Sequence, residues 1–566
     1  MNRLSRHLPA ACVVLCIALL WLYPLATMRL AAQWDAGVHL RWASQFHTAL
    51  LEGWLLPRWA HASLHGLGDP TFFYYQPLFY YLTSVLALMG ISPQYGLVLS
   101  GVAIYCLLGL VVYRFLAARY SAGKAAVGTI FVLVSPSTFF LASQMSAFPW
   151  VLSFPFSVLF VLESIRERPR VTRLAVLIGL VCMSHLLSAM MTLLCTALAR
   201  CVFAFPGRAT WKGLLVWGSG VMLGFGLVSF FLFPAVTQLD LISPTGWTDP
   251  TSYDWRKSFA FPVVTFFQHG LKWFGPQLPL PGLVLLMLVL TLLPTKLTPS
   301  PARTVVRRLA IVALAALALS TELAYPLYEY FTPLHKLQFP YRFIFLATVI
   351  ATIALAMHLN EGAWSCWSKP VRAIAIVLFA AYAGQLALLQ WKLIKEGVVL
   401  ADMPTIMAAS TGQPEYIPAV RGPDWERYVQ DGKLDGECRS LGIACAELQQ
   451  RTHTMSVVIE TPKSVNVSLP IFAFPAWRPD VDGRPQPLLV DKSTGLIQVN
   501  LPPGRHTVSL QWVRLPSEIT GMWISAVSLC LLAGILLVGR RMRHASPADE
   551  TRSSAVELQH GRQATP

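Results

Sequence analysis

Charged residues are scarce in this chain of 566 residues, where Asp, Glu, Lys and Arg together make up 13%. Soluble proteins carry about twice that share. Hydrophobic residues make up 55%, and long apolar runs with few charges recur from Cys12 to Val538. One globular core cannot bury so much apolar sequence, so lipid must be the solvent for most of the chain. We therefore expect the apolar runs to be helices that span a membrane.

Three further absences narrow the class of function. The sequence has no G-x-x-x-x-G-K-[ST] phosphate loop, so it does not look like an ATPase. No pair of cysteines or histidines has the spacing of a zinc site. No carboxylate lies near the middle of a clearly apolar span, which is where ion-coupled transporters usually place ionisable groups. The ionisable residues are concentrated instead in loops that we assign to the outer side.

The apolar runs predict twelve spans and a fixed orientation. The spans are residues 8–27, 95–117, 125–143, 149–165, 171–184, 186–206, 213–235, 280–298, 308–325, 341–359, 372–393 and 519–539. An even number puts both termini on one side, and the arginines that flank the first and last spans put that side in the cytoplasm. Cytoplasmic loops and span ends then carry 23 Lys and Arg against 6 Asp and Glu, whereas the rest of the chain carries 21 against 22. This orientation explains the net charge of +16 without a nucleic-acid partner.

Two apolar stretches need a separate interpretation. Phe72–Gly90 is apolar enough to span, but Arg114, Arg119 and Lys124 would then lie outside, so we interpret it as an aromatic-rich helix at the outer interface. The first span is followed by small residues that suit a signal-peptide cleavage site, but its apolar run is long for a signal peptide. We expect it to be an uncleaved anchor.

This topology predicts an α-helical polytopic membrane protein with a β-rich domain near its C-terminus. We assign residues 1–393 to the membrane domain, with a first outer loop at 28–92, residues 394–518 to a periplasmic β-rich domain, 519–539 to the final span and 540–566 to a disordered cytoplasmic tail. Apolar residues of the β-rich domain alternate at 465, 467 and 469, at 497, 499 and 501, and at 508, 510 and 512, with Pro502–Pro503–Gly504 as a turn. This alternation predicts a β-sandwich that is half buried on each strand.

Of the ten cysteines, only Cys438 and Cys445 lie in an aqueous outer segment. Their spacing allows a small disulfide loop in an oxidising periplasm. Two free thiols are the alternative.

The first outer loop holds the main candidate for catalysis, Asp35. It follows the first span closely, at the edge of the lipid, where partial desolvation raises the pKa of a carboxylate and its basicity. Such a group suits a general base that acts on a hydroxyl, although an Asp that caps a helix beginning near Ala36 fits the same spacing. His39 lies four residues further on the same helical face, where it can orient Asp35, touch substrate or meet lipid headgroups.

Other outer residues are candidates for binding the substrate. Arg342 should lie at the outer mouth of a span, where a cation either holds a phosphate or snorkels to the headgroups. The further candidates are Arg58, Asp69, Tyr75, Gln76, His185, His269 and Lys336. Turn formation for Asp69, an interfacial aromatic belt for Tyr75 and a structural role for His185 are the open alternatives.

These features resemble the GT-C superfamily of membrane glycosyltransferases, which have many spans, an acidic residue in a long first outer loop, and runs similar to Pro77–Leu78–Phe79–Tyr80–Tyr81. More closely, the chain resembles a bacterial family of membrane proteins labelled pyruvoyl-tetrahydropterin synthase related. The matching stretches are Asp35…His39, Pro57–Arg58–Trp59, Gly66–Leu67–Gly68, Tyr74–Tyr75–Gln76–Pro77, Ser184–His185–Leu186, Leu337–Gln338–Phe339–Pro340–Tyr341–Arg342 and Glu415–Tyr416–Ile417–Pro418. Residues from Phe474–Pro475–Ala476–Trp477 to Gly521 also resemble the outer module of a lipoteichoic-acid glycosylation family. Nothing in these residues supports pterin chemistry.

The resemblance implies an inverting sugar transfer from a polyprenyl-phosphate-linked donor. We expect the acceptor to be a glycan or lipid of the cell envelope, reached on the periplasmic side of the inner membrane, and we expect no cofactor. Carried over, Asp35 would deprotonate the acceptor hydroxyl and Arg342 would stabilise the departing lipid phosphate. Many GT-C enzymes have a second acidic residue in the next outer loop, but Ser143–Phe148 contains none, so we expect no metal shared by two carboxylates. A non-catalytic assembly subunit and a transporter or flippase of lipid-linked glycans remain alternatives.

Overall fold

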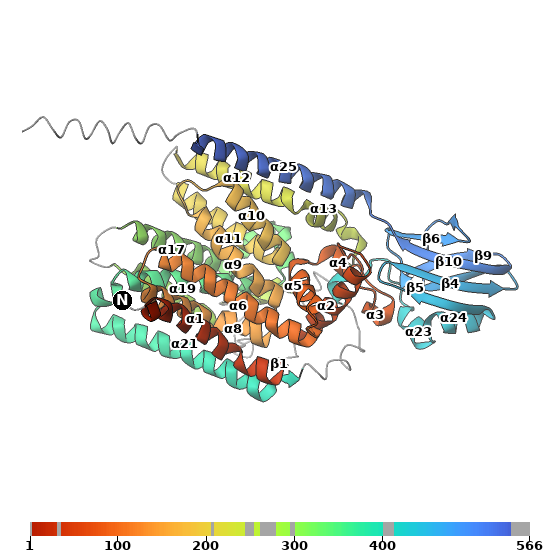
Figure 1. The fold of residues 1–566 in the computed structure, drawn as a ribbon, viewed down its shortest axis with the longest axis horizontal. Coiled ribbons are helices and arrows are strands. Elements are labelled where there is room, and N and C mark those ends of the chain that lie inside the picture. Colours follow the sequence, from red (N-terminus) through yellow and green to blue (C-terminus); the bar gives the residue numbers. More distant parts are fainter. Residues whose placement is uncertain are drawn as a thin grey trace, which may run out of the picture.

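The structure, a computed structural model, describes residues 3–30, 35–204, 209–243, 254–260, 279–294, 300–399 and 413–544. It consists of a long helical region with a smaller β domain at one end, and both ends of the described chain lie at the opposite end (Figure 1). We call the end that meets the β domain the domain end, and the other the distal end. The predicted tail after Arg543 lies almost wholly outside the described residues.

Each of the twelve predicted spans coincides with one or more helices. They are α1 (Arg3–Thr27), α6 (Pro93–Ala117), α7 (Ala122–Leu133) with α8 (Pro136–Phe139) and the π-helix η1 (Phe140–Gln144), α9 (Phe148–Ser164), α10 (Val171–Ser184), α11 (Leu186–Ala204), α12 (Ala209–Leu227) with α13 (Ser229–Thr237), α16 (Pro279–Leu292), α17 (Pro301–Leu319), α19 (Phe343–Asn360), α21 (Lys369–Glu396) and α25 (Pro516–His544). By length and composition, six helices in the described part of the chain can cross a membrane, or up to nine if each bent pair is one span. The mostly helical, apolar architecture is confirmed, and the number twelve stays a prediction.

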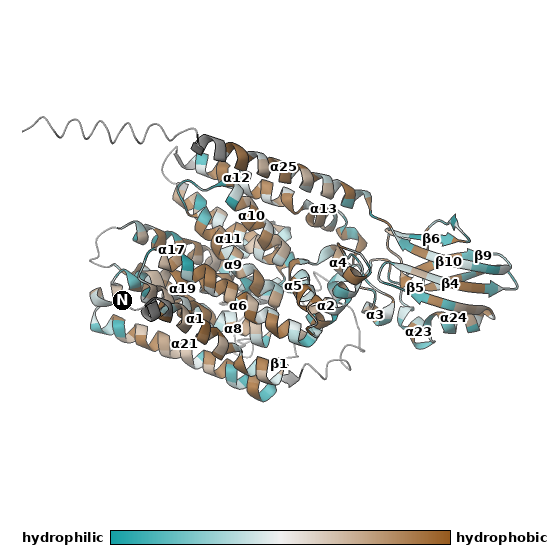
Figure 2. Cartoon of the chain, in the orientation of Figure 1, coloured by the Kyte–Doolittle hydropathy of each residue, from teal (hydrophilic) through white to brown (hydrophobic). Residues whose placement is uncertain are grey.

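Hydrophobic residues predominate along the helices of this region (Figure 2), and they are found on its outside as well as in its core. On α25, for example, Leu529, Leu531 and Leu537 are exposed, as expected for side chains that face lipid. The most buried of the long helices is α19, whose span is 89% buried inside the structure. The other helices therefore pack around α19, and the segment that immediately precedes it lies in the interior at the domain end.

The first outer loop forms a helical layer between the spans and the β domain (Figure 1). Its helices are α2 (Ala36–Leu51), α3 (Ser63–Gly66), α4 (Thr71–Tyr74) and α5 (Leu78–Leu88). The stretch 72–90 is thus broken by Pro77, and α5 has 11 residues. Such a helix rises about 16 Å, too little for a hydrocarbon core of about 30 Å. This short helix agrees with the interpretation of the stretch as a non-spanning element.

The predicted β-rich domain is confirmed, with eight strands in two antiparallel sheets. The five-stranded sheet has the order β3 (Ala444–Gln450), β4 (Thr454–Thr461), β10 (Gly504–Trp512), β6 (Trp477–Val481) and β7 (Arg484–Pro485). The three-stranded sheet has the order β5 (Val465–Phe472), β9 (Leu496–Leu501) and β8 (Leu489–Val490). The alternating residues of β5, β9 and β10 named above are all buried, because they face the space between the sheets. A disulfide joins Cys438, in α24 (Lys433–Leu441), to Cys445 in β3.

A buried ion pair holds the β domain, α25 and the first outer loop together. Nε of Arg58 donates to the Glu518 carboxylate at 2.7 Å, and both side chains are 2% exposed. Arg58 also donates to the Phe230 carbonyl at 2.8 Å, and its backbone N–H donates to Nε2 of His453 at 3.1 Å. The neighbouring Trp59 packs against Trp477 and Trp512 of the β domain. These contacts fix the outer loop both to the β domain and to the ends of α13 and α25.

Candidate functional site

A cavity of about 180 Å³ lies at the domain end, enclosed by the first outer loop, by helices of the spans and by the segment that leads into the β domain. Its polar and charged lining residues come from five separate stretches of sequence. They are Asp35, His39, Gln76, His185, Gln338, Arg342, Gln413 and Glu415. The structure therefore brings together the residues that the sequence singled out near the start, the middle and the end of the membrane region.

Asp35 stands at the first turn of α2, in the cavity wall. Its backbone N–H donates to the Met145 carbonyl at 3.0 Å, just after the π-helix η1, an element that is rare and frequent at functional sites. Within the described residues, its side chain makes no capping hydrogen bond to α2. Burial raises the pKa of Asp35 to about 6; Arg342 lowers it and Glu415 raises it. A carboxyl group with such a pKa is ionised at neutral pH and basic enough to accept a proton from a hydroxyl.

Arg342 stands at the end of the 3-10 turn η7 (Pro340–Arg342), directly before α19. Its Nη1 donates to the Leu337 carbonyl at 2.8 Å. The guanidinium lies 4.9 Å from the centre of the Phe339 ring and 5.7 Å from that of Trp150, within cation–π range. A fixed guanidinium presents several donors in one plane, which suits a phosphate group.

The segment before Arg342 contains a strained turn. Gln338 has φ 61° and ψ −47°, and the Phe339 N–H donates to the Leu337 carbonyl at 2.6 Å. This is a γ-turn of the rare form that disfavours residues with a side chain. The turn places Gln338 in the cavity lining, where its Nε2 lies 3.4 Å from Oε1 of Glu415. Strain at this position indicates that the surrounding packing, and not local preference, sets the conformation.

Glu415 supplies a second carboxylate to the cavity, from the 3-10 turn η9 (Pro414–Tyr416). The sequence led us to look for a second acid in the loop Ser143–Phe148, which has none. The cavity instead receives it from far along the chain, just before the β domain. No group of three or more His, Cys, Asp or Glu able to hold a metal occurs among the residues the structure covers. The two cavity acids share the lining with the cation Arg342, so the cavity is a mixed-charge site.

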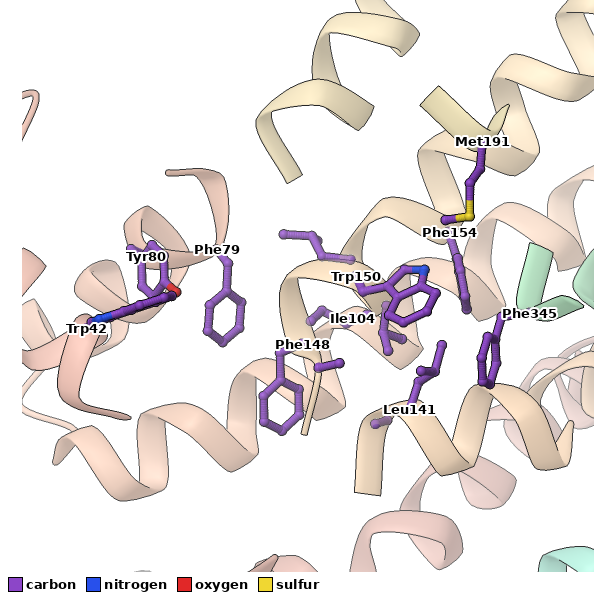
Figure 3. Packing of buried hydrophobic residues seen from close by; sticks show 14 of the residues in the cluster. Trp42, Phe79, Tyr80, Ile104, Leu141, Phe148, Trp150, Phe154, Met191 and Phe345 are labelled. Atoms are coloured by element: carbon purple, nitrogen blue, oxygen red, sulfur yellow. The ribbon is translucent and has the colours of Figure 1, made fainter. Parts of the chain in front are cut away.

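His39 and the aromatic rings of Trp42, Tyr75 and Tyr416 form one wall. Nδ1 of His39 hydrogen-bonds with the Tyr80 hydroxyl at 2.9 Å, and burial lowers the pKa of His39 to about 3. The histidine is therefore neutral and positions Tyr80 rather than supplying charge. The ring of Trp42 lies 4.8 Å from Tyr75 and 6.0 Å from Tyr416. Figure 3 shows Trp42 and Tyr80 close together, with Phe79 beside them.

His185 and Trp150 form part of the opposite wall. The break between α10 and α11 falls at His185, whose Nδ1 hydrogen-bonds with Oγ of Ser188 at 2.7 Å and accepts from its N–H at 3.1 Å. Its ring stacks on Trp150 at 5.4 Å, and Trp150 packs edge-on against Phe345 at 5.1 Å (Figure 3). His185 thus caps α11, the structural role left open above, and still faces the cavity.

Two buried polar atoms of the lining have no hydrogen-bond partner within the described ranges. They are Oε1 of Gln76 and Nε1 of Trp150. A buried polar atom without a partner is costly, so native structures rarely leave one. An acceptor and a donor left in this way suit a polar ligand with hydroxyl groups.

Three predicted substrate ligands lie elsewhere, and we correct their assignment. Arg58 is buried in the ion pair with Glu518, not in the cavity. Asp69 is fully buried, and its Oδ1 accepts from the N–H and hydroxyl of Thr71 at 3.0 and 2.5 Å, so it forms the turn that its neighbours favour. Lys336 is exposed and does not line the cavity. His269 lies outside the described residues.

The motif Gly66–Leu67–Gly68 lies at the junction between the first outer loop and the β domain, where it packs beside Trp59. Gly68 has φ 77°, and a Cβ there would come within 2.1 Å of the Trp59 indole. Only glycine permits both the turn and the close approach.

The lining residues that sequence reasoning did not propose as ligands are chiefly Glu415, Gln338, Gln413, Trp42 and Trp150. Glu415 and Gln338 stand in two of the stretches that carry the family resemblance. Their presence in those stretches was the signal available in the sequence, because a polar residue in a stretch shared by a family is more often kept for binding or catalysis than for packing.

Comparison with known proteins gives one family and three remotely similar chains of solved structures, which include AftD and ArnT. A family model described as "6-pyruvoyl-tetrahydropterin synthase related domain; membrane protein" matches residues 72–394, more than half of the chain. No curated protein matches the sequence.

The first of the two structures is the arabinofuranosyltransferase AftD from Mycobacteria, at 15% identity and a TM-score of 0.45. That likeness covers 91% of this chain and 40% of AftD, so the present chain spans well under half of AftD. The second is ArnT from Cupriavidus metallidurans bound to undecaprenyl phosphate, at 14% identity and a TM-score of 0.39, covering 71% of this chain and 74% of ArnT. Both TM-scores lie below 0.5, so the functional argument rests on the cavity.

Proposed function

Because the chain belongs to the membrane-protein family described as 6-pyruvoyl-tetrahydropterin synthase related, and its cavity joins a carboxylate base to a fixed guanidinium, we propose that it is a GT-C-type glycosyltransferase. The donor is a polyprenyl-phosphate-linked sugar, and the acceptor is a glycan or lipid of the cell envelope. The observation that carries the proposal is the presence of Asp35 and Arg342 in one cavity. The proposal does not draw on the pterin chemistry that the family description mentions.

The reaction follows from the roles of these two residues. Asp35 accepts the proton of the acceptor hydroxyl as the hydroxyl oxygen attacks the anomeric carbon of the donor. The bond from that carbon to the phosphate oxygen breaks, and polyprenyl phosphate leaves with the bonding electrons. Arg342 binds the phosphate and stabilises the negative charge that develops on it. A single displacement of this kind inverts the anomeric configuration.

The cavity wall accounts for recognition of a sugar. Faces of Trp42 and Tyr75 suit the apolar faces of a sugar ring, and the unpartnered atoms of Gln76 and Trp150 suit its hydroxyls. Glu415 lies beside Gln338 and raises the pKa of Asp35, so it increases the basicity of Asp35 and supplies a further acceptor for hydroxyls.

The orientation is part of the proposal. Both ends of the described chain lie at the distal end, where the positive-inside rule puts the cytoplasm (Figure 1). The cavity and the β domain then face the periplasm of a bacterial inner membrane. Envelope acceptors are reached from that side.

The test is a transfer assay with the Asp35→Asn variant in membranes or in purified form. A comparison of glycolipids from cells with and without the protein first identifies the acceptor. Release of polyprenyl phosphate is then measured for the wild type, Asp35→Asn and the control Asp431→Asn, whose side chain is 65% exposed in the β domain. We expect Asp35→Asn to abolish turnover and Asp431→Asn to retain it. Undiminished turnover of well-expressed Asp35→Asn would remove Asp35 as the base.

Two other outcomes separate the remaining functions. An unchanged envelope glycan profile in the knockout, with co-purification of another complex, would favour an assembly subunit. Movement of lipid-linked glycan across sealed vesicles without sugar transfer would favour a flippase.

A further inference from the structure

A second and larger cavity lies at the distal end, away from the proposed site. Its volume is about 1450 Å³, and it is bordered by α6, α9, α10, α17 and α25. We call it the distal groove. The ends of these helices that border it are the ends far from the β domain (Figure 1). In the orientation proposed above, it lies at the level of the lipid headgroups on the side opposite the proposed transfer site.

Arginines dominate the charge of the distal groove. Six arginines and two glutamates line it, which leaves a surplus of four positive charges; the arginines are Arg114, Arg119, Arg166, Arg168, Arg173 and Arg308. They come from α6, α10, α17 and the connections after α6 and α9, so no single amphipathic helix accounts for the cluster.

The two glutamates are already engaged by part of this set. Glu163 lies 3.2 Å from Arg166 and 3.6 Å from Arg173, and Glu167 lies 3.2 Å from Arg308. In the part of the chain that the structure describes, no carboxylate lies within ion-pairing distance of Arg114, Arg119 or Arg168. These three cations form an exposed rim that a bound anion can reach.

Apolar walls lie directly beneath the rim. On α6 and α10, Leu110 and Leu177 are four residues deeper than Arg114 and Arg173, a rise of about 6 Å. On α25 the wall is formed by Leu532 and Leu536. The groove is therefore cationic at headgroup level and hydrocarbon-like below it.

We propose that the distal groove binds an anionic glycerophospholipid of the bilayer. The phosphate of the lipid bonds to the arginine rim, and its acyl chains lie along the apolar walls. A soluble phosphate would leave those walls without a partner, and a zwitterionic lipid would leave the positive surplus uncompensated. Basic pockets between spans are suited to anionic headgroups in this way.

The test compares lipids of equal chain length. The full-length protein, purified in detergent, is incubated with equal amounts of phosphatidylglycerol and phosphatidylcholine, and bound lipid is counted by native mass spectrometry. We expect the wild type to prefer phosphatidylglycerol by about fivefold or more, since each arginine near an anionic surface has an effect of that order. Equal binding of the two lipids would overturn the proposal.

Two charge-removing variants distinguish lipid binding at the groove from lipid attraction by surface charge elsewhere on the protein. Arg114→Gln/Arg168→Gln removes rim charge, and Arg484→Gln/Arg505→Gln removes the same charge from the exposed β domain. We expect the first to lose the preference and the second to keep it. Loss in both, or in neither, contradicts a site at the rim.

A third variant tests the walls. Val176 and Leu536 line the groove and are 42% and 46% exposed, so Val176→Trp/Leu536→Trp fills it without removing charge. We expect this variant to lose bound phosphatidylglycerol. Retention would show that the arginines attract lipid only at the surface. Displacement of the lipid by millimolar inorganic phosphate would indicate a free-phosphate site instead.

Discussion

The guanidinium of Arg342 lowers the pKa of the Asp35 carboxyl, but burial in their common cavity raises it more, so the pKa settles at about 6. The two residues stand at the start and near the end of the membrane region. Their juxtaposition places a carboxyl group of raised pKa and a cation within one small cavity.

The rate of sugar transfer should depend on pH through Asp35. A general base works only when ionised, so kcat/KM should fall tenfold per pH unit below about 6 and be level above it. Arg342→Gln should move this limb to higher pH, because it removes the cation that lowers the pKa. Glu415→Gln should move it to lower pH, because it removes an anion that raises the pKa. A limb that stays in place in both variants would show that another group titrates.

Asp35→Asn should abolish turnover without lowering stability. The folded-state pKa of about 6 exceeds the ordinary 3.8, so ionised Asp35 destabilises the fold by at most about 3 kcal/mol above pH 6, and this effect vanishes below pH 4. The neutral amide lacks this cost. We expect the Tm of Asp35→Asn to equal or exceed that of the wild type at pH 8 and the difference to shrink as the pH falls to 4.5. A Tm well below wild type at pH 8 would identify Asp35 as a structural residue.

The γ-turn at Gln338 should show its strain in a matched pair of variants. Gln338→Gly and Gln338→Ala both remove the amide beside Glu415, but only glycine adopts φ 61° without strain. We expect Gln338→Gly to be more stable than Gln338→Ala by about 1 kcal/mol or more, measured by thermal unfolding in detergent. Equal stabilities would mean that the turn relaxes.

Glu518→Gln should destabilise the junction without altering the chemistry. It leaves Arg58 charged and buried without a carboxylate, which costs about 3–5 kcal/mol. Arg58→Met/Glu518→Leu, which removes both charges, should recover most of this loss. Hydrogen exchange should rise around Trp59 and Trp512 in the single variant, whereas the pH dependence of transfer should stay that of the wild type. A shifted pH limb in Glu518→Gln would place the ion pair in the catalytic machinery.

Local patterns in the sequence were enough to predict the apolar helices and the strands. Each depends on apolar residues spaced along one segment, and so do the buried faces of β5, β9 and β10. Asp35 was identifiable because its depth relative to the first span already implies desolvation.

The partners of Asp35 depend on tertiary contacts that spacing does not encode. Glu415 is close to it only because the segment before the β domain returns to the spans, where the N–H of Ser243 donates to the Ile417 carbonyl at 2.8 Å and that of Ala419 to the Leu241 carbonyl at 2.9 Å. Arg58 lies outside the cavity for a related reason, because its ion-pair partner Glu518 is 460 residues away in the sequence. A polar residue in an outer loop looks the same in sequence whether it meets a ligand or a distant ion-pair partner.

The segment that carries Glu415 belongs both to the cavity and to the connection with the β domain, so the chain cannot be cut cleanly between the two. Pro414–Pro418 closes the cavity, and within a few residues the chain is bonded to the β-sandwich, where the N–H of Gly422 donates to the Thr494 carbonyl. A shortened chain that ends before this segment would keep Asp35 and Arg342, but its cavity would be open and would lack Glu415. If the β domain were exchanged between relatives, the segment Pro414–Pro418 would therefore have to stay with the helical region from which it comes.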